Sequence, residues 1–408
     1  MKQLSSLCLA LLLAAPALGF ESKDGDRVVL IGSTLIEREQ RYGYWETALT
    51  IQNPDKNITF RNLGWSGDSV WGEARAEFGT VADGYKHLVD HVRAEKPTVI
   101  IVGYGTNESF AGEEGLPKFK EQLKKLLDDL STTKARLILM SPPPVDEDHW
   151  KYGNAKERNR LLKLYGGAIL DEAKARSAAF VPDIYQDYGP SLPLTDNGIH
   201  LNAWGYRFTA YGLLNELKVR SPDRKTIELN GRGLVRVTQP VLPPVPSPLG
   251  QGVGELYGDS LVHVKGLEPG NYTLQIDGRA VHTLSPAEEE QFIKSKGEHP
   301  VKGTLTRDAD RWKRGIFDQD TVLVLDGPSL DQGEKLRQTI IAKNELYFHR
   351  WRPQNTTYLF GFRKHEQGQN AREIPQFDPL VAAKEKEIAE LKKPREHIYE
   401  LVPANEKK

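Results

Sequence analysis

The sequence contains almost no cysteine: Cys8 is the single one among 408 residues. It lies in an N-terminal segment that export would remove, which would leave a mature protein without a thiol. That excludes disulfides, thiolate catalysis and cysteine-ligated metals. We expect no metal or other cofactor.

Long apolar runs are also scarce. The run from Leu7 to Leu13 is shorter than the roughly 20 residues that a membrane span needs. It follows the charged Lys2 and precedes the small residues of 15–19, which is the pattern of a secretory signal peptide. We therefore predict a signal peptide over residues 1–19 and an exported protein, periplasmic or extracellular, with no membrane anchor after cleavage.

An excess of positive or negative charge is missing as well. The chain has 55 Lys and Arg against 56 Asp and Glu, a formal net charge of −1, and no long basic block. This balance argues against a nucleic-acid partner.

The first half of the chain alternates short apolar runs, typical of buried strands, with amphipathic segments typical of helices. Such alternation predicts a parallel sheet covered by helices on both faces, a three-layer α/β/α fold. The expected strands are 26–32, 58–64, 97–103, 135–141 and 178–184, and the expected helices are 35–51, 85–94, 115–130, 158–175 and 203–217.

Three of these strands end in a glycine-bearing turn with small polar residues, at 32–34, 64–66 and 105–107. Sites in parallel sheets form at the carboxyl ends of the strands. We expect these turns to open on the same edge of the sheet as His200.

His200 lies on a short turn before a helical segment. A histidine on such a turn can act as a general base when a neighbouring group orients its ring. Asp196 and Asn197, four and three positions earlier, are both candidates for that group.

Ester hydrolysis needs a hydroxyl nucleophile, a base, a group that orients the base, and donors for the oxyanion. The chain has a candidate for each role. They are Ser33 or Thr34, His200, Asp196 or Asn197, and the Gly64 N–H with the Asn107 side chain.

In this order, four motifs resemble those of the SGNH, or GDSL-type, hydrolase superfamily. They stand at 29–34, 62–67, 105–108 and 196–200, so that the resemblance covers about Arg27 to Leu217. It implies an SGNH/flavodoxin-like fold and a carboxylic ester hydrolase, here a divergent exported bacterial member.

Two positions depart from the family pattern. The family's nucleophilic serine falls on Thr34, and its acid, three residues before the histidine, falls on Asn197. A threonine next to a base can be a nucleophile, but its β-methyl group crowds the attack. The Gly-Asp-Ser of residues 67–69 follows the second motif and is not the first motif. We predict catalytic roles for Thr34, His200 and Asp196, and oxyanion or substrate binding by Gly64, Asn107 and Ser33.

The second half changes character at the proline-rich stretch 239–248. Beyond it we expect antiparallel strands at 261–264 and 272–276, a strand at 322–325, and helices at 287–294, 336–348 and 379–394. The predicted domains are an α/β domain at 20–220, a linker and small β module at 221–331, and a helical C-terminal region at 332–408.

Residues 349–366 mix arginines with aromatic residues. Planar arginines beside aromatic rings suit carbohydrate or carboxylate recognition. A buried structural network is the alternative.

The function predicted from the sequence is an exported esterase that removes small acyl groups, such as acetyl, from a carbohydrate. The alternative is a catalytically inactive carbohydrate-binding or structural protein that kept the scaffold. A hydroxyl within hydrogen-bond reach of His200 would favour the esterase.

Overall fold

The computed structural model describes residues 20–185, 194–219, 226–230, 233–242, 244, 260–265, 272–284, 321–325, 328–366 and 370–403. The predicted signal peptide and the predicted helix at 287–294 lie outside these residues.

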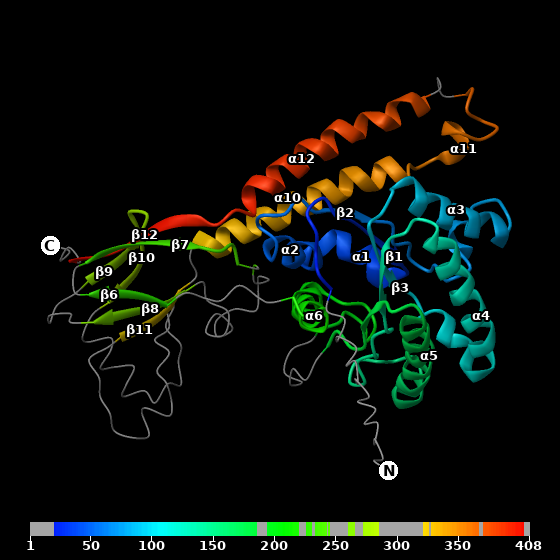
Figure 1. Ribbon diagram of the computed structural model, residues 1–408, viewed down its shortest axis with the longest axis horizontal. Coiled ribbons are helices and arrows are strands. Elements are labelled where there is room, and N and C mark those ends of the chain that lie inside the picture. The colour runs from blue at the N-terminus through cyan, green and yellow to red at the C-terminus, as the bar shows by residue number, and fades with distance from the viewer. Residues whose placement is uncertain are drawn as a thin grey trace, which may run out of the picture.

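A parallel five-stranded sheet forms the centre of the first half, as predicted (Figure 1). Its order is β2-β1-β3-β4-β5. The second strand thus lies on one side of β1, and the third, fourth and fifth follow on the other side. In this flavodoxin-like order, ligands bind at the carboxyl ends of the strands next to the β1/β3 switch point. The strands are β1 (Arg27–Gly32), β2 (Thr59–Asn62), β3 (Val99–Gly103), β4 (Arg136–Met140) and β5 (Ala179–Val181).

Six α-helices and two short 3-10 helices surround this sheet. The predicted helix at 35–51 is two helices, because Gly43 adopts a left-handed φ of 67° that ends the first one. The elements are α1 (Thr34–Tyr42), α2 (Tyr44–Ile51), η1 (Glu73–Arg75), α3 (Val81–Ala94), η2 (Glu108–Ala111), α4 (Gly112–Ser131), α5 (Ala155–Ala175) and α6 (Ala203–Glu216).

The side chains of β1 alternate between two hydrophobic cores. Val28 and Leu30 pack with residues of α1, α2 and α6 on one face of the sheet. Val29 and Ile31 pack with residues of α3, α4 and α5 on the other face. The strands are therefore covered on both sides, which explains their nearly continuous apolar sequences.

The β module contains two sheets, ordered β10-β9-β12-β7 and β11-β8-β6. The predicted antiparallel pairing of 261–264 with 272–276 is wrong, because these strands lie in different sheets. One side of β9 pairs with β12, a strand within the region predicted as helical. The strands are β6 (Thr226–Asn230), β7 (Leu234–Gln239), β8 (Ser260–Lys265), β9 (Tyr272–Ile276), β10 (Arg279–Leu284), β11 (Thr321–Leu325) and β12 (Arg395–Pro403).

A helical hairpin connects the β module to the α/β domain. Its long helices α10 (Pro328–Trp351) and α12 (Phe377–Leu391) run side by side along the α/β domain (Figure 1). The short elements α11 (Thr356–Leu359) and η3 (Asn370–Gln376) lie between them in the chain.

A buried ion pair fixes the hairpin to the α/β domain. Lys343 of α10 is 1% exposed and contacts Glu46 of α2, with Nζ 2.7 Å from Oε1. It also donates to the Phe60 carbonyl of β2 at 3.1 Å. The hairpin is thus packed on β2, the edge strand of the sheet.

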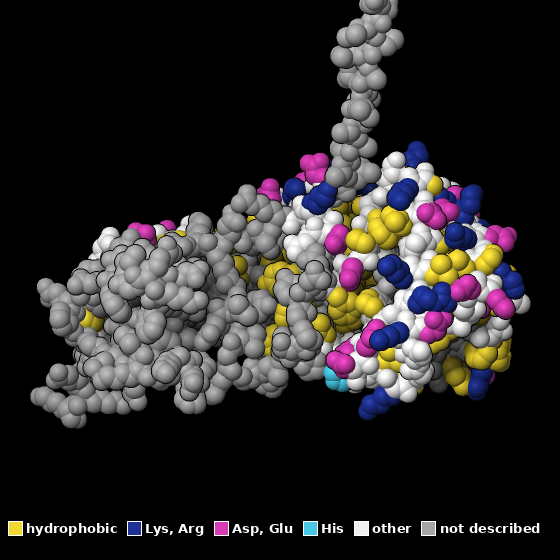
Figure 2. Space-filling view, turned by 90° about the horizontal axis from the view of Figure 1, so that it is seen from below, with side chains coloured by type: hydrophobic (Ala, Val, Ile, Leu, Met, Phe, Trp, Pro, Cys, Tyr) yellow, Lys and Arg dark blue, Asp and Glu magenta, His cyan; other side chains and the backbone are white. Residues whose placement is uncertain are grey.

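Acidic and basic side chains are interspersed over the face of the α/β domain that Figure 2 shows. This mixed surface agrees with the near-zero net charge. Within the described residues, no helix has the length and apolar character that crossing a membrane requires.

Candidate active site

The predicted nucleophile turn lies directly at the carboxyl end of β1. A Cβ atom on Gly32 would lie 2.5 Å from the Gly103 carbonyl oxygen, so only glycine lets β1 and β3 approach here. Ser33 is the N-cap residue of α1 and is 3% exposed. Thr34, the first residue of the helix, is half-buried. Thr34 therefore presents the more accessible hydroxyl of the two.

A backbone donor lies beside this hydroxyl. The Gly67 N–H donates to Thr34 Oγ1 at 3.4 Å. Gly67 has a left-handed φ of 79°, and no atom lies within 4 Å of where its Cβ would be. The loop after β2 thus directs an N–H toward Thr34 and leaves space next to it.

Gly64 does not take the predicted role of oxyanion donor. Its N–H donates to the Asn62 side chain at 2.9 Å. A Cβ on Gly64 would lie 2.4 Å from the Glu37 nitrogen, so this glycine permits close packing of the loop on α1. Gly67, three residues later, is the donor instead, which was not predicted from the sequence. Its signal was the Gly-Asp-Ser of residues 67–69.

Asn107 follows β3, as predicted, and contacts the same loop. Its Nδ2 donates to the Asp68 carbonyl at 2.7 Å. The amide has a second N–H, which is not needed for this bond. The Asn107 side chain therefore lies next to Gly67 and could be a second oxyanion donor.

Buried charged side chains hold the loop that carries Gly67 in place. Asp68 and Arg75 are both fully buried and paired, with Arg75 Nε 2.6 Å from Asp68 Oδ2. The Tyr104 hydroxyl donates to the same oxygen at 3.0 Å. Arg75 also donates to the Leu63 carbonyl at 2.8 Å. These bonds fix the backbone on both sides of Gly67.

Glu108 links this loop to the turn after β3. Its two carboxylate oxygens accept from the Val70 and Gly105 N–H groups, each at 2.8 Å. Burial raises the pKa of Glu108 to about 7.

The turn that carries His200 is organised by Asn197. Asn197 Oδ1 accepts from the backbone N–H of His200 at 2.9 Å, and its Nδ2 lies 3.3 Å from His200 Nδ1. Because Oδ1 is committed to the backbone, Nδ2 is the group that donates to the ring. A neutral His200 then carries its own proton on Nε2, which is the wrong tautomer for a base acting through Nε2.

The contacts of Asp196 contradict the prediction that it orients His200. Its carboxylate pairs with Arg38 of α1 at 2.7 Å, and its side chain is 51% exposed. Asp196 precedes by one residue the position that contacts the His200 ring, and its side chain contacts α1 instead. Burial lowers the pKa of His200, and the nearby Arg38 lowers it further, against the opposing effect of Asp196.

The histidine turn is nevertheless held at the carboxyl edge of the sheet. Arg38 also donates to the Leu201 carbonyl at 3.2 Å, so its two contacts flank His200 and attach the turn to α1. Among the hydrogen bonds of the described residues, none connects His200 with Thr34.

A second Asp–His pair lies beside this turn, in the loop after β4. Asp146 Oδ2 is 2.7 Å from His149 Nδ1, and the Asp146 N–H donates to the Gly198 carbonyl at 2.8 Å. A carboxylate on Nδ1 leaves the lone pair on Nε2, as a general base requires. The His149 side chain is 52% exposed. This pair was not predicted from the sequence, although Asp-x-x-His at 146–149 was its signal.

The C-terminal hairpin also reaches the loop after β2. The Arg352 guanidinium lies 3.4 Å from the centre of the Trp65 ring, and its Nη1 is 3.2 Å from Glu37 Oε2. Glu37 in turn accepts from the Ser66 N–H. Part of the predicted aromatic and basic segment thus borders the loop that carries Gly67.

No group of three or more His, Cys, Asp or Glu residues suited to a metal ion occurs within the described ranges.

Comparison with known proteins identifies the domain. Residues 28–208 match the model of the GDSL-like lipase/acylhydrolase family. The match covers most of the α/β domain, which is therefore called the GDSL-like domain below.

Solved structures extend the comparison beyond the GDSL-like domain. A gut microbial diltiazem-metabolizing enzyme, BT4096, is 15% identical and superposes with a TM-score of 0.63, covering 94% of this chain and 99% of its own. The two proteins therefore share a fold over nearly their whole length.

Two smaller structures match about half of the chain. The acetylxylan esterase Axe2 from Geobacillus stearothermophilus is 19% identical, covers 50% of this chain and 100% of its own, and has a TM-score of 0.38. TesA is 16% identical, covers 47% and 98%, and has a TM-score of 0.36. None of the curated proteins matches the chain.

Proposed function

We propose that this protein is an exported esterase that removes small acyl groups, such as acetyl, from a carbohydrate. The GDSL-like domain supports ester hydrolysis. The observation that carries the assignment to Thr34 is the Gly67 N–H beside the Thr34 hydroxyl, because a nucleophile in this chemistry needs an adjacent backbone donor. Export rests on the signal-peptide pattern of residues 1–19.

In the proposed reaction, Thr34 Oγ1 attacks the ester carbonyl. The oxyanion accepts hydrogen bonds from the Gly67 N–H and the Asn107 side chain. His200 takes the hydroxyl proton at Nε2 and gives it to the departing alcohol, and water then releases the acyl group from Thr34. Before the first step, the ring has to adopt the tautomer that the Asn197 amide disfavours.

The same Asn197 contact supports a second candidate, a carbohydrate-binding protein that retains the scaffold without catalysis. The half-exposed position of Asp196 points in this direction too. The two candidates differ in whether the Thr34 hydroxyl is needed for ester turnover.

Kinetics on acetylated xylooligosaccharides and on p-nitrophenyl acetate test the proposal. Thr34→Ala should abolish hydrolysis, whereas Ser33→Ala should largely spare it. Thr34→Ser should raise the rate, because it removes the crowding methyl group and keeps the hydroxyl.

The base is tested by a matched pair of histidine variants. His200→Ala should abolish hydrolysis, and His149→Ala should leave most of it; the reverse result would assign the base to the Asp146–His149 pair. Unchanged turnover in Thr34→Ala would show that the threonine is not the nucleophile. No turnover in either the wild type or Thr34→Ser would favour the binding protein.

A further inference from the structure

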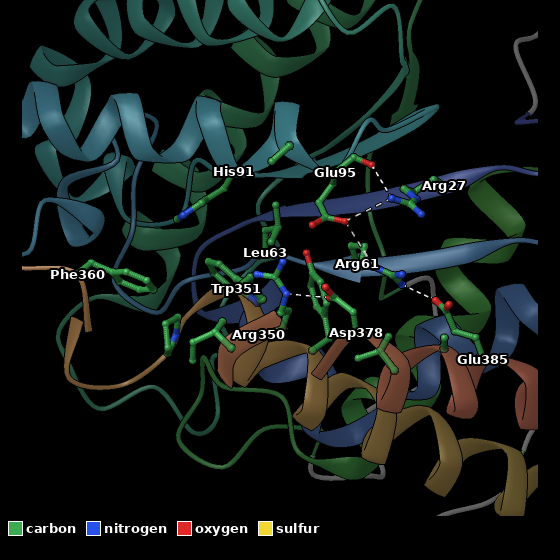
Figure 3. A pocket seen from close by; sticks show the side chains of 16 residues that line it. Arg27, Arg61, Leu63, His91, Glu95, Arg350, Trp351, Phe360, Asp378 and Glu385 are labelled. Atoms are coloured by element: carbon green, nitrogen blue, oxygen red, sulfur yellow. Dashed lines mark hydrogen bonds and ion pairs between the residues drawn. The ribbon is translucent and has the colours of Figure 1, made fainter. Parts of the chain in front are cut away.

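A cavity of about 600 Å³ lies between α3, the edge strand β2 and the α10–α12 hairpin (Figure 3). Its volume falls within the range of about 300 to 1,000 Å³ that is usual for small-molecule sites. Its lining includes neither Thr34 nor His200. The cavity is therefore separate from the candidate active site.

One end of the cavity is lined by alternating charges. Arg61 Nη1 is 2.6 Å from Glu385 of α12, and Arg61 Nε is 3.5 Å from Glu95, the residue that follows α3. Arg27 donates to the Glu95 carbonyl at 3.0 Å. Figure 3 shows these side chains following one another along the wall.

Arg350 and Asp378 add a third ion pair, 2.8 Å apart, between α10 and α12. The lining thus contains three arginines and three carboxylates, Arg27, Arg61, Arg350, Glu95, Asp378 and Glu385, which balance each other formally. A balanced wall offers both hydrogen-bond donors and acceptors without favouring a ligand of either charge.

The other end is aromatic. Trp351 lies edge-on to His91, with ring centres 5.4 Å apart, and Phe360 lies close by in Figure 3. Trp351 Nε1 and His91 Nδ1 are buried and have no hydrogen-bond partner among the described residues. Burial lowers the pKa of His91 to about 4, so the ring is neutral.

We propose that this cavity binds a neutral polyhydroxylated ligand, namely a short oligosaccharide. Sugars combine apolar faces, which pack on aromatic rings, with hydroxyl groups that both donate and accept hydrogen bonds. Those two features match the two ends of the cavity. A charged ligand would bind less well, since the wall has no excess of either sign. The site does not depend on the proposed esterase activity.

Trp351 also connects the cavity with the candidate active site. Its ring centre is 5.9 Å from that of Trp65, next to the loop that carries Gly67. One oligosaccharide could thus extend from the cavity toward Thr34, with Trp351 between the two sites.

Calorimetry and tryptophan fluorescence with the whole mature protein test the proposal, with xylotetraose as the neutral probe and tetragalacturonate as the charged one. The wild type should bind xylotetraose and should prefer it to tetragalacturonate. Phe360→Ala and Arg350→Ala should each weaken binding by at least about tenfold. Both side chains are partly exposed, so these changes should preserve the fold.

Two matched variants serve as controls. Phe362 and Arg363 belong to the same segment, are exposed, and do not line the cavity. Phe362→Ala and Arg363→Ala should therefore bind like the wild type. Thr34→Ala should also bind normally, which separates this site from the esterase. No binding by the wild type, equal losses in the controls, or a preference for tetragalacturonate would overturn the proposal.

Discussion

The two sides of the candidate active site are built differently. On the nucleophile side, the loop around Gly67 rests on the buried Asp68–Arg75 pair and on Glu108. On the histidine side, the carboxylate of Asp196 is half-exposed and an amide contacts the ring. The first side places a backbone donor beside the Thr34 hydroxyl, and the second lacks the charge that would stabilise a protonated histidine. The weaker side of the site is therefore the one that orients the base, not the one that holds the nucleophile.

The largest expected effect comes from breaking the buried ion pair that fixes the helical hairpin to the α/β domain. Lys343→Met would leave Glu46 buried without its partner. We expect a loss of about 3–5 kcal/mol in the free energy of unfolding, measured by urea denaturation. The exposed pair of Lys393 with Glu390 provides the control, since Lys393→Met should cost less than about 1 kcal/mol. Equal costs for the two variants would show that the hairpin is not anchored by this pair.

Giving His200 a carboxylate partner should raise the rate of ester hydrolysis. Asn197→Asp would place a carboxylate on His200 Nδ1, set the proton there, and free Nε2 to act as the base. We expect kcat to increase by about 10²-fold. Asn154→Asp, which changes an N-cap residue of α5, is the control and should leave kcat unchanged. If Asn197→Asp is no faster than the wild type, the ring tautomer does not limit the reaction.

A pH-dependent contribution to stability is expected from Glu39 on α1. Its Oε1 accepts from the Trp45 and Glu46 N–H groups, and burial raises its pKa to about 8. Folded protein then holds a proton that the unfolded chain loses above about pH 4.5. Stability should therefore fall as the pH rises from about 5 to 8. Glu39→Gln should reduce this slope in urea titrations at several pH values, and an undiminished slope would refute the assignment.

The smallest effect is expected at Asp196. Its pair with Arg38 is exposed, so Asp196→Ala should lower the free energy of unfolding by less than about 1 kcal/mol. Hydrolysis should change little, because the carboxylate does not contact the ring. A loss of activity comparable to that of His200→Ala would restore Asp196 as the catalytic acid.

The sequence predicted the parallel sheet because hydrophobic periodicity records which faces are buried. It also placed Thr34 and Asn107 after the correct strands. It assigned the oxyanion role to Gly64 instead of Gly67, since both follow β2 and only the path of the loop shows that the Gly64 N–H bonds to Asn62.

Two other features depended on information that periodicity does not contain. The direction of the Asp196 side chain is decided by Arg38, which lies far away in the sequence. Likewise, β8 and β9 both have recognisable strand patterns, but such a pattern does not show which strand each one pairs with. The partners of β9 are β10, its neighbour in sequence, and β12, more than a hundred residues away.

The position of β12 has a consequence for synthesis. Residues 395–403 lie between β7 and β9 and pair with both, so this sheet cannot close until they have left the ribosome. The GDSL-like domain, by contrast, has its strands and helices complete once α6 has emerged. Domains fold as units during translation, and pairing between distant segments is slow. The α/β domain should thus fold well before the β module, and the edges of β7 and β9 stay open to other chains until β12 has emerged.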